Sequence, residues 1–275
     1  HWPGFPSAEA QREKELMELW REAALKIQRL DVPPVPVPGA AELLPIGEKP
    51  LMTWRGSAGA SGYDVERAAS ADGPWGVIAP NVCDADIAYR PLFSDTTAVA
   101  GQKYFYRVVA RNSSGRAEPS NVVGPVQIKN VCFVDELQNF SLAKAHSDDL
   151  TLDNTFNALY AEHLFRAKGV AKSWISYKVA TAMSSFKVIA WFGESVADLT
   201  FEVSADGQGF SEVKAERRER RFPPPPGGPG AGQKRTMVEY DCAVAAGQTS
   251  LKLTWTGPAS LDRVEILYGG NGKAK

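Results

Sequence analysis

The stretch Val32-Pro33-Pro34-Val35-Pro36-Val37-Pro38-Gly39 separates two patterns of different kind. Proline cannot continue a helix and has no backbone N–H to donate in a sheet, so the stretch predicts a stiff, extended, polyproline-like spacer. The residues before it carry the pattern of one helix, and those after it read almost entirely as strands and turns. We therefore expect a mainly β protein in which residues 31–42 form a Pro-rich linker.

Composition limits the kinds of partner that the chain can attract. Its 275 residues are 44% hydrophobic and 23% charged, which is typical of a globular chain of one to three domains. A formal net charge of -1 at pH 7 excludes strong electrostatic attraction to nucleic acid or to an anionic membrane. No apolar run is long enough to span a bilayer. We expect neither nucleic acid nor a membrane as a partner.

Three cysteines are spread along the chain at Cys83, Cys132 and Cys242. They are too few and too scattered for a disulfide framework or a zinc site. Cys132 and Cys242 could form a disulfide if their strands adjoin. Free, buried thiols that pack as small apolar side chains are the favoured interpretation.

Residues 7–29 carry the pattern of a single amphipathic helix. Ser7 suits the capping position, and acidic residues gather near the N-terminal end, where the helix dipole favours them. Apolar residues recur at helical spacing and predict one apolar stripe: Leu16, Trp20, Ala23, Ala24, Ile27 and Leu30. No other helix of this length follows in the sequence, so we expect the stripe to dock on a β-domain or on material outside this chain.

The first 30 residues resemble the end of a (β/α)8 barrel. The motif His1-Trp2-Pro3-Gly4-Phe5, followed by a charged helix and a Pro-rich spacer, is similar to the last strand and helix of family 5 glycoside hydrolases, mannanase-like members in particular. The resemblance implies that Trp2 lines the sugar subsite beside the cleaved bond. It also implies that the catalytic glutamates belong to barrel strands preceding His1. The alternative is that Trp2 packs against the chain near Trp20.

Residues 43–128 show short alternating strands separated by turn signals, and the strongest strand is predicted over Lys103–Asn112. The pattern resembles a fibronectin type III domain, and the residues that carry the resemblance are Trp54, Tyr63 and the segment Gly101–Asn121. The resemblance implies a β-sandwich in which Tyr104 is the corner tyrosine, whose hydroxyl bonds back to the backbone.

Residues 129–271 carry a second all-β pattern of about eight strands, which suits a two-sheet sandwich or jelly roll, and residues 272–275 form a tail. Four alternate residues of a long strand are expected on one side: Phe186, Val188, Ala190 and Phe192. This long strand is preceded by the strand Trp174-Ile175-Ser176-Tyr177, and the last strand is expected over Leu261–Tyr268. The order of these strands resembles the galactose-binding-like sandwich of many carbohydrate-binding modules. The resemblance implies a ligand on loops at one end, often with a structural calcium nearby.

Acidic residues before the second strand of this domain are candidate metal ligands. Asp148, Asp149 and Asp153 lie close together with Asn154, and hard cations such as calcium take six to eight oxygen ligands. The positions do not form an EF-hand loop. A solvated loop is the favoured alternative, so structural calcium is a candidate cofactor only.

The following segment contains three candidate sugar contacts: Tyr160, His163 and Arg166. Sugars are bound by aromatic rings that stack on their apolar faces and by planar groups that hydrogen-bond their hydroxyls. The three residues supply both kinds of group. The alternative is that Tyr160 and His163 pack beneath a loop.

The order of these parts favours a non-catalytic accessory region of a secreted, extracellular glycoside hydrolase that degrades a mannan-like plant polysaccharide. Its partners would be the polysaccharide and a preceding catalytic barrel domain. Because no pair of carboxylates and no nucleophile motif stands in a recognisable catalytic context, we expect no hydrolysis by this chain alone. Two alternatives remain open: an interaction or spacer module of a surface protein, and part of an active glycoside hydrolase whose barrel comes from a missing segment or another chain.

Overall fold

The computed structural model describes residues 7–28, 34–87, 91–154, 165–193, 197–222 and 235–269. The chain divides into two compact units, His1–Pro36 and Val37–Lys275, and the division falls within the predicted linker. The described residues form one α-helix and several sandwich-like sheets. The expected fold class, mainly β with one preceding helix, is therefore confirmed.

The first unit contains helix α1 (Ser7–Gln28), which begins at the predicted residue and ends one residue before the predicted end. Several of its apolar side chains are exposed: Leu16, Met17, Leu19, Trp20 and Leu25. Trp20 is 72% exposed, so within the first unit no described residue covers the described part of the predicted stripe. No described helix is long and apolar enough to cross a membrane.

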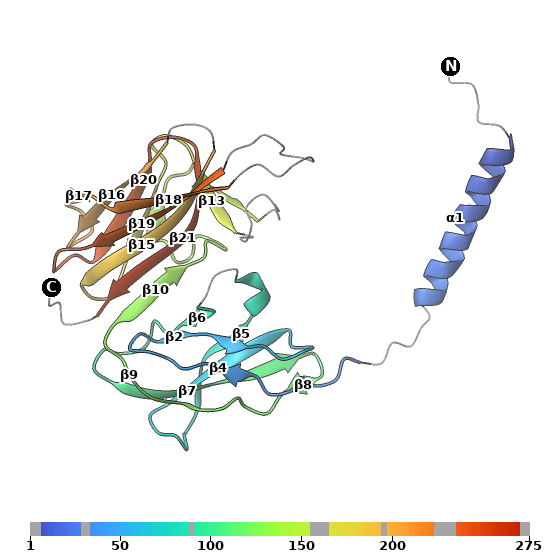
Figure 1. Cartoon of the computed structure of the whole chain (residues 1–275), viewed down its shortest axis with the longest axis horizontal. Coiled ribbons are helices and arrows are strands. Elements are labelled where there is room, and N and C mark those ends of the chain that lie inside the picture. Colours follow the sequence, from blue (N-terminus) through green and yellow to red (C-terminus); the bar gives the residue numbers. More distant parts are fainter. Residues whose placement is uncertain are drawn as a thin grey trace. The chain divides into compact units, whose positions relative to one another are not determined.

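The second unit begins with two two-stranded sheets and one five-stranded sheet (Figure 1). One pairs β1 (Glu42–Leu43) with β3 (Trp54–Arg55), and another pairs β2 (Leu51–Met52) with β6 (Phe93–Ser94). The third has five strands: β5 (Gly76–Val82), β4 (Gly62–Ala68), β7 (Lys103–Asn112), β8 (Gly115–Arg116) and β9 (Val123–Gln127). A short 3-10 helix covers Asp84–Asp86.

The strands β4 and β7 form the centre of the five-stranded β4–β7 sheet. The bounds of β7 are those predicted from its alternation, and three of its alternate side chains are fully buried: Tyr106, Val108 and Ala110. Tyr63 and Val65 are buried on the same side of β4, as predicted. The hydroxyl of Tyr104 accepts a hydrogen bond from the backbone N–H of Val99 at 3.4 Å, which is the contact expected of a corner tyrosine. Membership of the fibronectin type III family stays a prediction.

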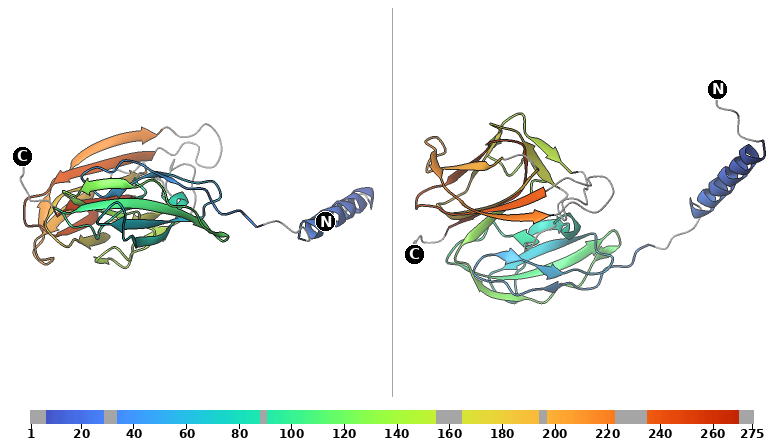
Figure 2. Two further views of the ribbon diagram at one scale, coloured as in Figure 1. Left: turned by 90° about the horizontal axis from the view of Figure 1, so that it is seen from below. Right: turned by 45° about the horizontal axis from the view of Figure 1, so that its top comes forward.

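The remaining described strands form a seven-stranded and a second five-stranded sheet, which Figure 2 shows from two further sides. The seven-stranded sheet contains β10 (Val131–Asp135), β12 (Thr151–Asp153), β13 (Arg166–Gly169), β15 (Met183–Phe192), β18 (Glu216–Phe222), β19 (Arg235–Ala243) and β21 (Ala259–Tyr268). The five-stranded β14–β20 sheet contains β11 (Ala145–His146), β14 (Trp174–Lys178), β16 (Leu199–Ser204), β17 (Ser211–Val213) and β20 (Ser250–Trp255).

The core between these two sheets follows the predicted alternation. The four residues of β15 that were expected on one side are all buried: Phe186, Val188, Ala190 and Phe192. Ile189 and Trp191 are also buried, although they lie on the opposite side of the strand. The two sheets hold twelve described strands, whereas about eight were expected. Three of the additional strands, β11, β12 and β17, are two or three residues long and too short to show alternation.

The cysteines are free thiols. Cys132 lies in β10 and Cys242 in β19, and both β21 and β15 lie between these strands. Three strand spacings amount to about 14 Å, whereas the Cα atoms of a disulfide lie within about 7 Å of each other. The two cysteines therefore cannot pair, and burial raises the pKa of the Cys132 thiol to about 12.

Both groups of sheets belong to the same compact unit. Within the described residues, no sheet combines strands from both sides of the predicted boundary at residues 128 and 129. Hydrogen bonds cross between the groups: the Tyr268 hydroxyl donates to the Thr96 carbonyl at 3.3 Å, and the Ser94 hydroxyl donates to the Cys132 carbonyl. The domain boundaries themselves stay a prediction.

Candidate functional site

The β14–β20 sheet carries a groove of about 480 Å³ on the face that points away from the core. We call it the aromatic–lysine groove, and it is lined by Lys144, Trp174, Ser176, Lys178, Asp206, Gln208, Phe210, Ser250 and Lys252, among others. The lining comes from β14, β20, the start of β11 with the residue before it, and the turn between β16 and β17. Segments distant in sequence therefore meet at this one face.

Alternation along β14 decides which side chains reach the groove. Ile175 and Tyr177 are buried in the core, so Trp174, Ser176 and Lys178 point to the opposite face. Trp174 is half-buried and Lys178 is exposed. The strand thus presents an aromatic ring, a hydroxyl and an ammonium group in a row.

Register brings β20 into the same surface. Lys252 lies directly opposite Ser176, and Ser250 lies directly opposite Lys178. Residues opposite each other on antiparallel strands share a face, with Cβ atoms about 5 Å apart. The two strands together therefore form the floor of the groove.

The ammonium group of Lys252 lies between two aromatic rings. Its nitrogen is 5.9 Å from the ring centroid of Trp174 and 5.8 Å from that of Phe210. Both distances are near the outer limit of a cation–π interaction, which is about 6 Å. The same nitrogen is 3.0 Å from a carboxylate oxygen of Glu202, which holds it at the centre of the face.

The turn after β16 places a carboxylate at the rim of the groove. Oδ1 of Asp206 accepts hydrogen bonds from the Ser204 hydroxyl at 2.9 Å and from the backbone N–H groups of Gln208 and Gly209 at 2.8 and 3.2 Å. These bonds favour the ionised form and hold the pKa of Asp206 below its ordinary value. Gly207 has a φ of +87°, which glycine adopts without strain.

The floor of the groove contains one polar side chain that is almost fully buried. Ser250 is 3% exposed, and its hydroxyl has no hydrogen-bond partner among the described residues. Beneath the floor, the hydroxyl of Tyr177 donates to Asp135 at 3.0 Å. Burial raises the pKa of both Asp135 and Tyr177. The floor is thus rigidly supported and offers an unused hydroxyl.

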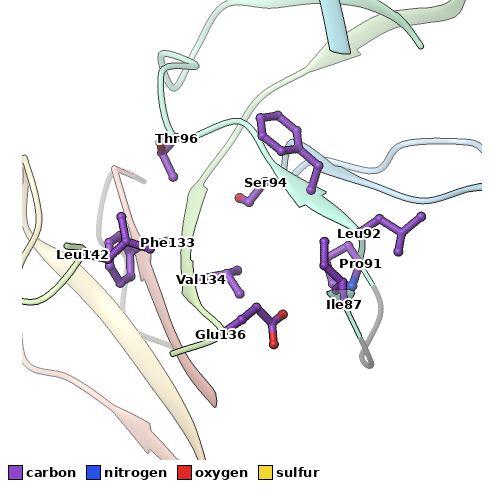
Figure 3. Close-up of a pocket in the computed structure, with 10 residues that line it drawn as sticks. Ile87, Pro91, Leu92, Ser94, Thr96, Phe133, Val134, Glu136 and Leu142 are labelled. Carbon is purple, nitrogen blue, oxygen red and sulfur yellow. The ribbon is translucent and has the colours of Figure 1, made fainter. Parts of the chain in front are cut away.

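A second hollow, of about 280 Å³, lies where β10 meets the segment that leads into β6 (Figure 3). Figure 3 shows Val134 and Glu136 on one wall, facing Ile87 and Leu92 on the other. Its lining is mainly apolar, and the carboxylate of Glu136 is ion-paired with Arg263. It offers few polar groups with which to orient a ligand.

The predicted sugar contacts are only partly described. Trp2, Tyr160 and His163 lie outside the described residues. Arg166 lies in β13 and is fully buried, and its Nη2 is 3.1 Å from Oδ2 of Asp153. Its predicted role as a sugar contact stays a prediction, and the structure gives it an internal ion pair.

The predicted calcium ligands face different partners. Oδ2 of Asp153 is also 2.6 Å from the ammonium group of Lys168, so this carboxylate faces two cationic side chains. Asp149 accepts a hydrogen bond from the Ser173 hydroxyl at 2.7 Å, and hydrogen bonds from serine side chains lower its pKa. Asp148 is exposed. Within the described ranges, no group of three or more His, Cys, Asp or Glu is arranged to hold a metal ion, and calcium stays a prediction.

The groove contains residues that sequence reasoning did not select as a site. Alternation places Trp174 in a strand but does not by itself show that its ring is accessible. The signal was present, because Trp174 and Lys178 occupy the face opposite the apolar Ile175. Phe210 and Lys252 carried no such signal, because their place beside Trp174 depends on the pairing of strands.

No family model matches the chain. No curated protein matches it either. Several solved structures are similar at low identity.

A carbohydrate-binding module (CBM6cm-2) of Cellvibrio mixtus lichenase 5A, solved in complex with cellotriose, is 14% identical, and the match covers 49% of this chain and 95% of the module with a TM-score of 0.31. The exo-beta-1,3-galactanase of Phanerochaete chrysosporium is 15% identical, with coverage of 84% and 57% and a TM-score of 0.28. The FN1-FN3 domains of chicken CNTN1 are 13% identical, with coverage of 82% and 66% and a TM-score of 0.24. The chain thus spans little more than half of the galactanase, and similarity this low does not say what the chain binds.

Proposed function

We propose that this chain is a non-catalytic carbohydrate-binding region, and that the aromatic–lysine groove holds the polysaccharide. The observation that carries the proposal is the placement of Trp174 and Phe210 on either side of Lys252 on an open sheet face. Aromatic rings stack on the apolar faces of sugars, and charged or hydroxyl groups beside them bind the sugar hydroxyls. Lys252, Asp206 and Ser250 supply those polar groups.

The sheets at residues 129–271 would act by bringing an attached enzyme to its polysaccharide. A module that binds an insoluble polymer raises the effective concentration of any enzyme attached to it, and it needs no catalytic group of its own. The sequence resemblance supports a secreted family 5 glycoside hydrolase, mannanase-like, as the parent enzyme. Residues 43–128, fibronectin-like in sequence, and the linker at residues 31–42 would then set reach and orientation.

The test is a depletion assay of the purified chain on insoluble mannan, cellulose and xylan, with released reducing sugar measured in the same tubes. We expect selective depletion without sugar release. Trp174→Ala should abolish the depletion, whereas Trp75→Ala, which removes a half-buried tryptophan outside the groove, should leave it unchanged.

Two results would count against the proposal. Depletion that survives Trp174→Ala and Phe210→Ala together would remove the groove from the binding surface. Release of reducing sugar by the chain alone would show that it is an enzyme.

The exposed apolar side chains of α1 favour a second role, as a surface for a protein partner. Leu16, Met17 and Trp20 are all more than half exposed, and such a helix face normally packs against another element. A preceding catalytic barrel domain is the partner that the sequence resemblance supports. An interaction module without sugar binding is the competing function, and it predicts no depletion from any polymer.

A further inference from the structure

We propose that the aromatic–lysine groove selects polysaccharides whose sugar units carry negatively charged substituents, either carboxylate or sulfate groups. This inference rests on the proposed function, because it names the ligand class of the same groove. It is carried by the position of three lysines, by their ion pairing and by the surroundings of the single aspartate in the lining.

The three lysines gather around Ser176. Lys252 is its register partner on β20, and Lys178 lies two residues along β14 on the same face. The backbone N–H of Lys144 donates to the Ser176 carbonyl at 2.8 Å, which brings Lys144 to the other edge of β14. Three lysines from three segments therefore border one short stretch of the floor.

Two of these lysines have no counter-ion among the residues that the structure describes. Lys252 is paired with Glu202. Lys144 and Lys178 are exposed, and among the described residues no carboxylate lies within ion-pair distance of either. Their charges are thus available to a ligand.

The aspartate in the lining does not cancel this charge. Asp206 is the one carboxylate among the described lining residues, against three lysines. Its Oδ1 already accepts three hydrogen bonds from its own turn. The groove is therefore locally positive in a chain whose formal net charge is -1.

This charge distribution separates charged from neutral sugars. A neutral sugar that covers Lys144 and Lys178 displaces water from their ammonium groups and returns only hydrogen bonds to hydroxyls. A carboxylate or sulfate returns charge-assisted hydrogen bonds, which are about twice as strong. Trp174 and Phe210 still supply the rings on which the sugar stacks, so the ligand that fits is a glycan with both an apolar face and an anionic substituent.

The test is calorimetric titration of the full chain with matched pairs of oligosaccharides. Mannohexaose and the mannuronate hexamer differ only at the sixth carbon, and a sulfated galactan oligosaccharide is compared with its desulfated form. We expect each charged member to bind at least about tenfold more tightly than its neutral partner. The preference should fall about tenfold between about 0.05 M and about 0.5 M salt, because both lysines are exposed and their charge is screened.

Variants connect the preference to the groove. Lys178→Gln and Lys144→Gln should each weaken binding of the charged members about fivefold, and should weaken binding of the neutral members by less than about twofold, because Gln keeps a hydrogen-bond donor and loses only the charge. Lys103→Gln, at an exposed lysine on β7, is the matched control and should change neither.

The outcomes separate the two proposals. Equal binding of charged and neutral members, or tighter binding of the neutral ones, would overturn the charge selection and leave the carbohydrate-binding function intact. A charge preference that persists in Lys178→Gln, Lys144→Gln double variants would also overturn the inference. Failure of every oligosaccharide to bind would overturn both proposals.

Discussion

Two sheet faces of this protein differ in how far their charged side chains are paired with each other. On the β4–β7 sheet, Asp64 and Glu66 are 4% and 5% exposed, and arginines cover them. Glu66 pairs with Arg107 at 2.6 Å and with Arg116 at 2.9 Å. On the β14–β20 sheet, three lysines border an open groove, and among the described residues only Lys252 has a carboxylate partner.

The difference also extends to the tryptophans. The ring of Trp75, just before β5, is covered by the guanidinium group of Arg107, whose carbon is 4.3 Å from the ring centroid. By contrast, the Lys252 nitrogen lies 5.9 Å from the ring centroid of Trp174. A face whose cations and rings are already engaged with each other has a structural role. A face that leaves them open is the one that can bind a ligand.

The largest expected effect tests the face of the β4–β7 sheet, where the charged side chains are paired. Glu66→Ala should lower the free energy of unfolding by about 3 kcal/mol, because it leaves the charge of Arg107 without its buried carboxylate. Glu202→Ala, on the open face, should cost only about 0.5 kcal/mol, because the Glu202–Lys252 pair is about one-third exposed. Urea denaturation of both variants measures the contrast, and equal losses would break the comparison.

The space around a glycine also distinguishes a packed part of the protein from the turn beside the groove. A Cβ on Gly169 of β13 would lie 2.7 Å from the buried ring of Trp255, so Gly169→Ala should cost about 2 kcal/mol of unfolding free energy. A Cβ on Gly209, in the turn beside the groove, would meet nothing within 4 Å, so Gly209→Ala should be nearly neutral. Thermal unfolding of the two alanine variants checks this, and a neutral Gly169→Ala would refute the packing.

Asp135 sharpens the comparison, because it is a buried carboxylate whose hydrogen-bond partners among the described residues are neutral, the Leu137 N–H and the Tyr177 hydroxyl. Burial raises its pKa in the folded protein above the ordinary value. Its favourable contribution is therefore complete below the ordinary aspartate pKa and is lost as pH rises through the raised value.

Asp135→Asn should accordingly gain stability relative to the natural chain on going from about pH 4 to about pH 7. Denaturant titrations at the two pH values measure this difference. Asp72→Asn, at an exposed position, is the control and should show no such gain. If Asp135→Asn instead lost stability relative to the natural chain at the higher pH, the pKa of Asp135 would be lowered by folding and not raised.

The smallest expected effect concerns the rim of the groove. Asp206→Asn keeps an oxygen that can accept the hydrogen bonds of the turn, and it removes a negative charge. Binding of the mannuronate hexamer should then tighten about twofold, while binding of mannohexaose should stay the same or weaken. Calorimetry distinguishes these results, and weaker binding of the charged hexamer would count against charge selection.

Sequence reasoning located the strands well and the groove poorly. Alternation over Lys103–Asn112 predicted the full length of β7, because a strand buried on one face must repeat every second residue. Strands such as β11 and β17 could not be predicted, since two or three residues show no period. Whether Cys132 and Cys242 can form a disulfide also depends on the order of the strands in the sheet, which no local sequence pattern contains.

The sequence by itself determined the mainly β fold, the single helix before a proline stretch and the faces of the long strands, because proline chemistry and alternation act locally. Only the tertiary structure decided which strands lie side by side, and hence that Trp174, Lys252 and Phe210 meet on one face. It also decided that the acidic and basic residues of β4 and β7 neutralise each other, whereas Lys144 and Lys178 do not find such partners among the described residues. The physical reason is that sheet pairing joins residues far apart in the chain, and the chemistry of a site depends on those neighbours.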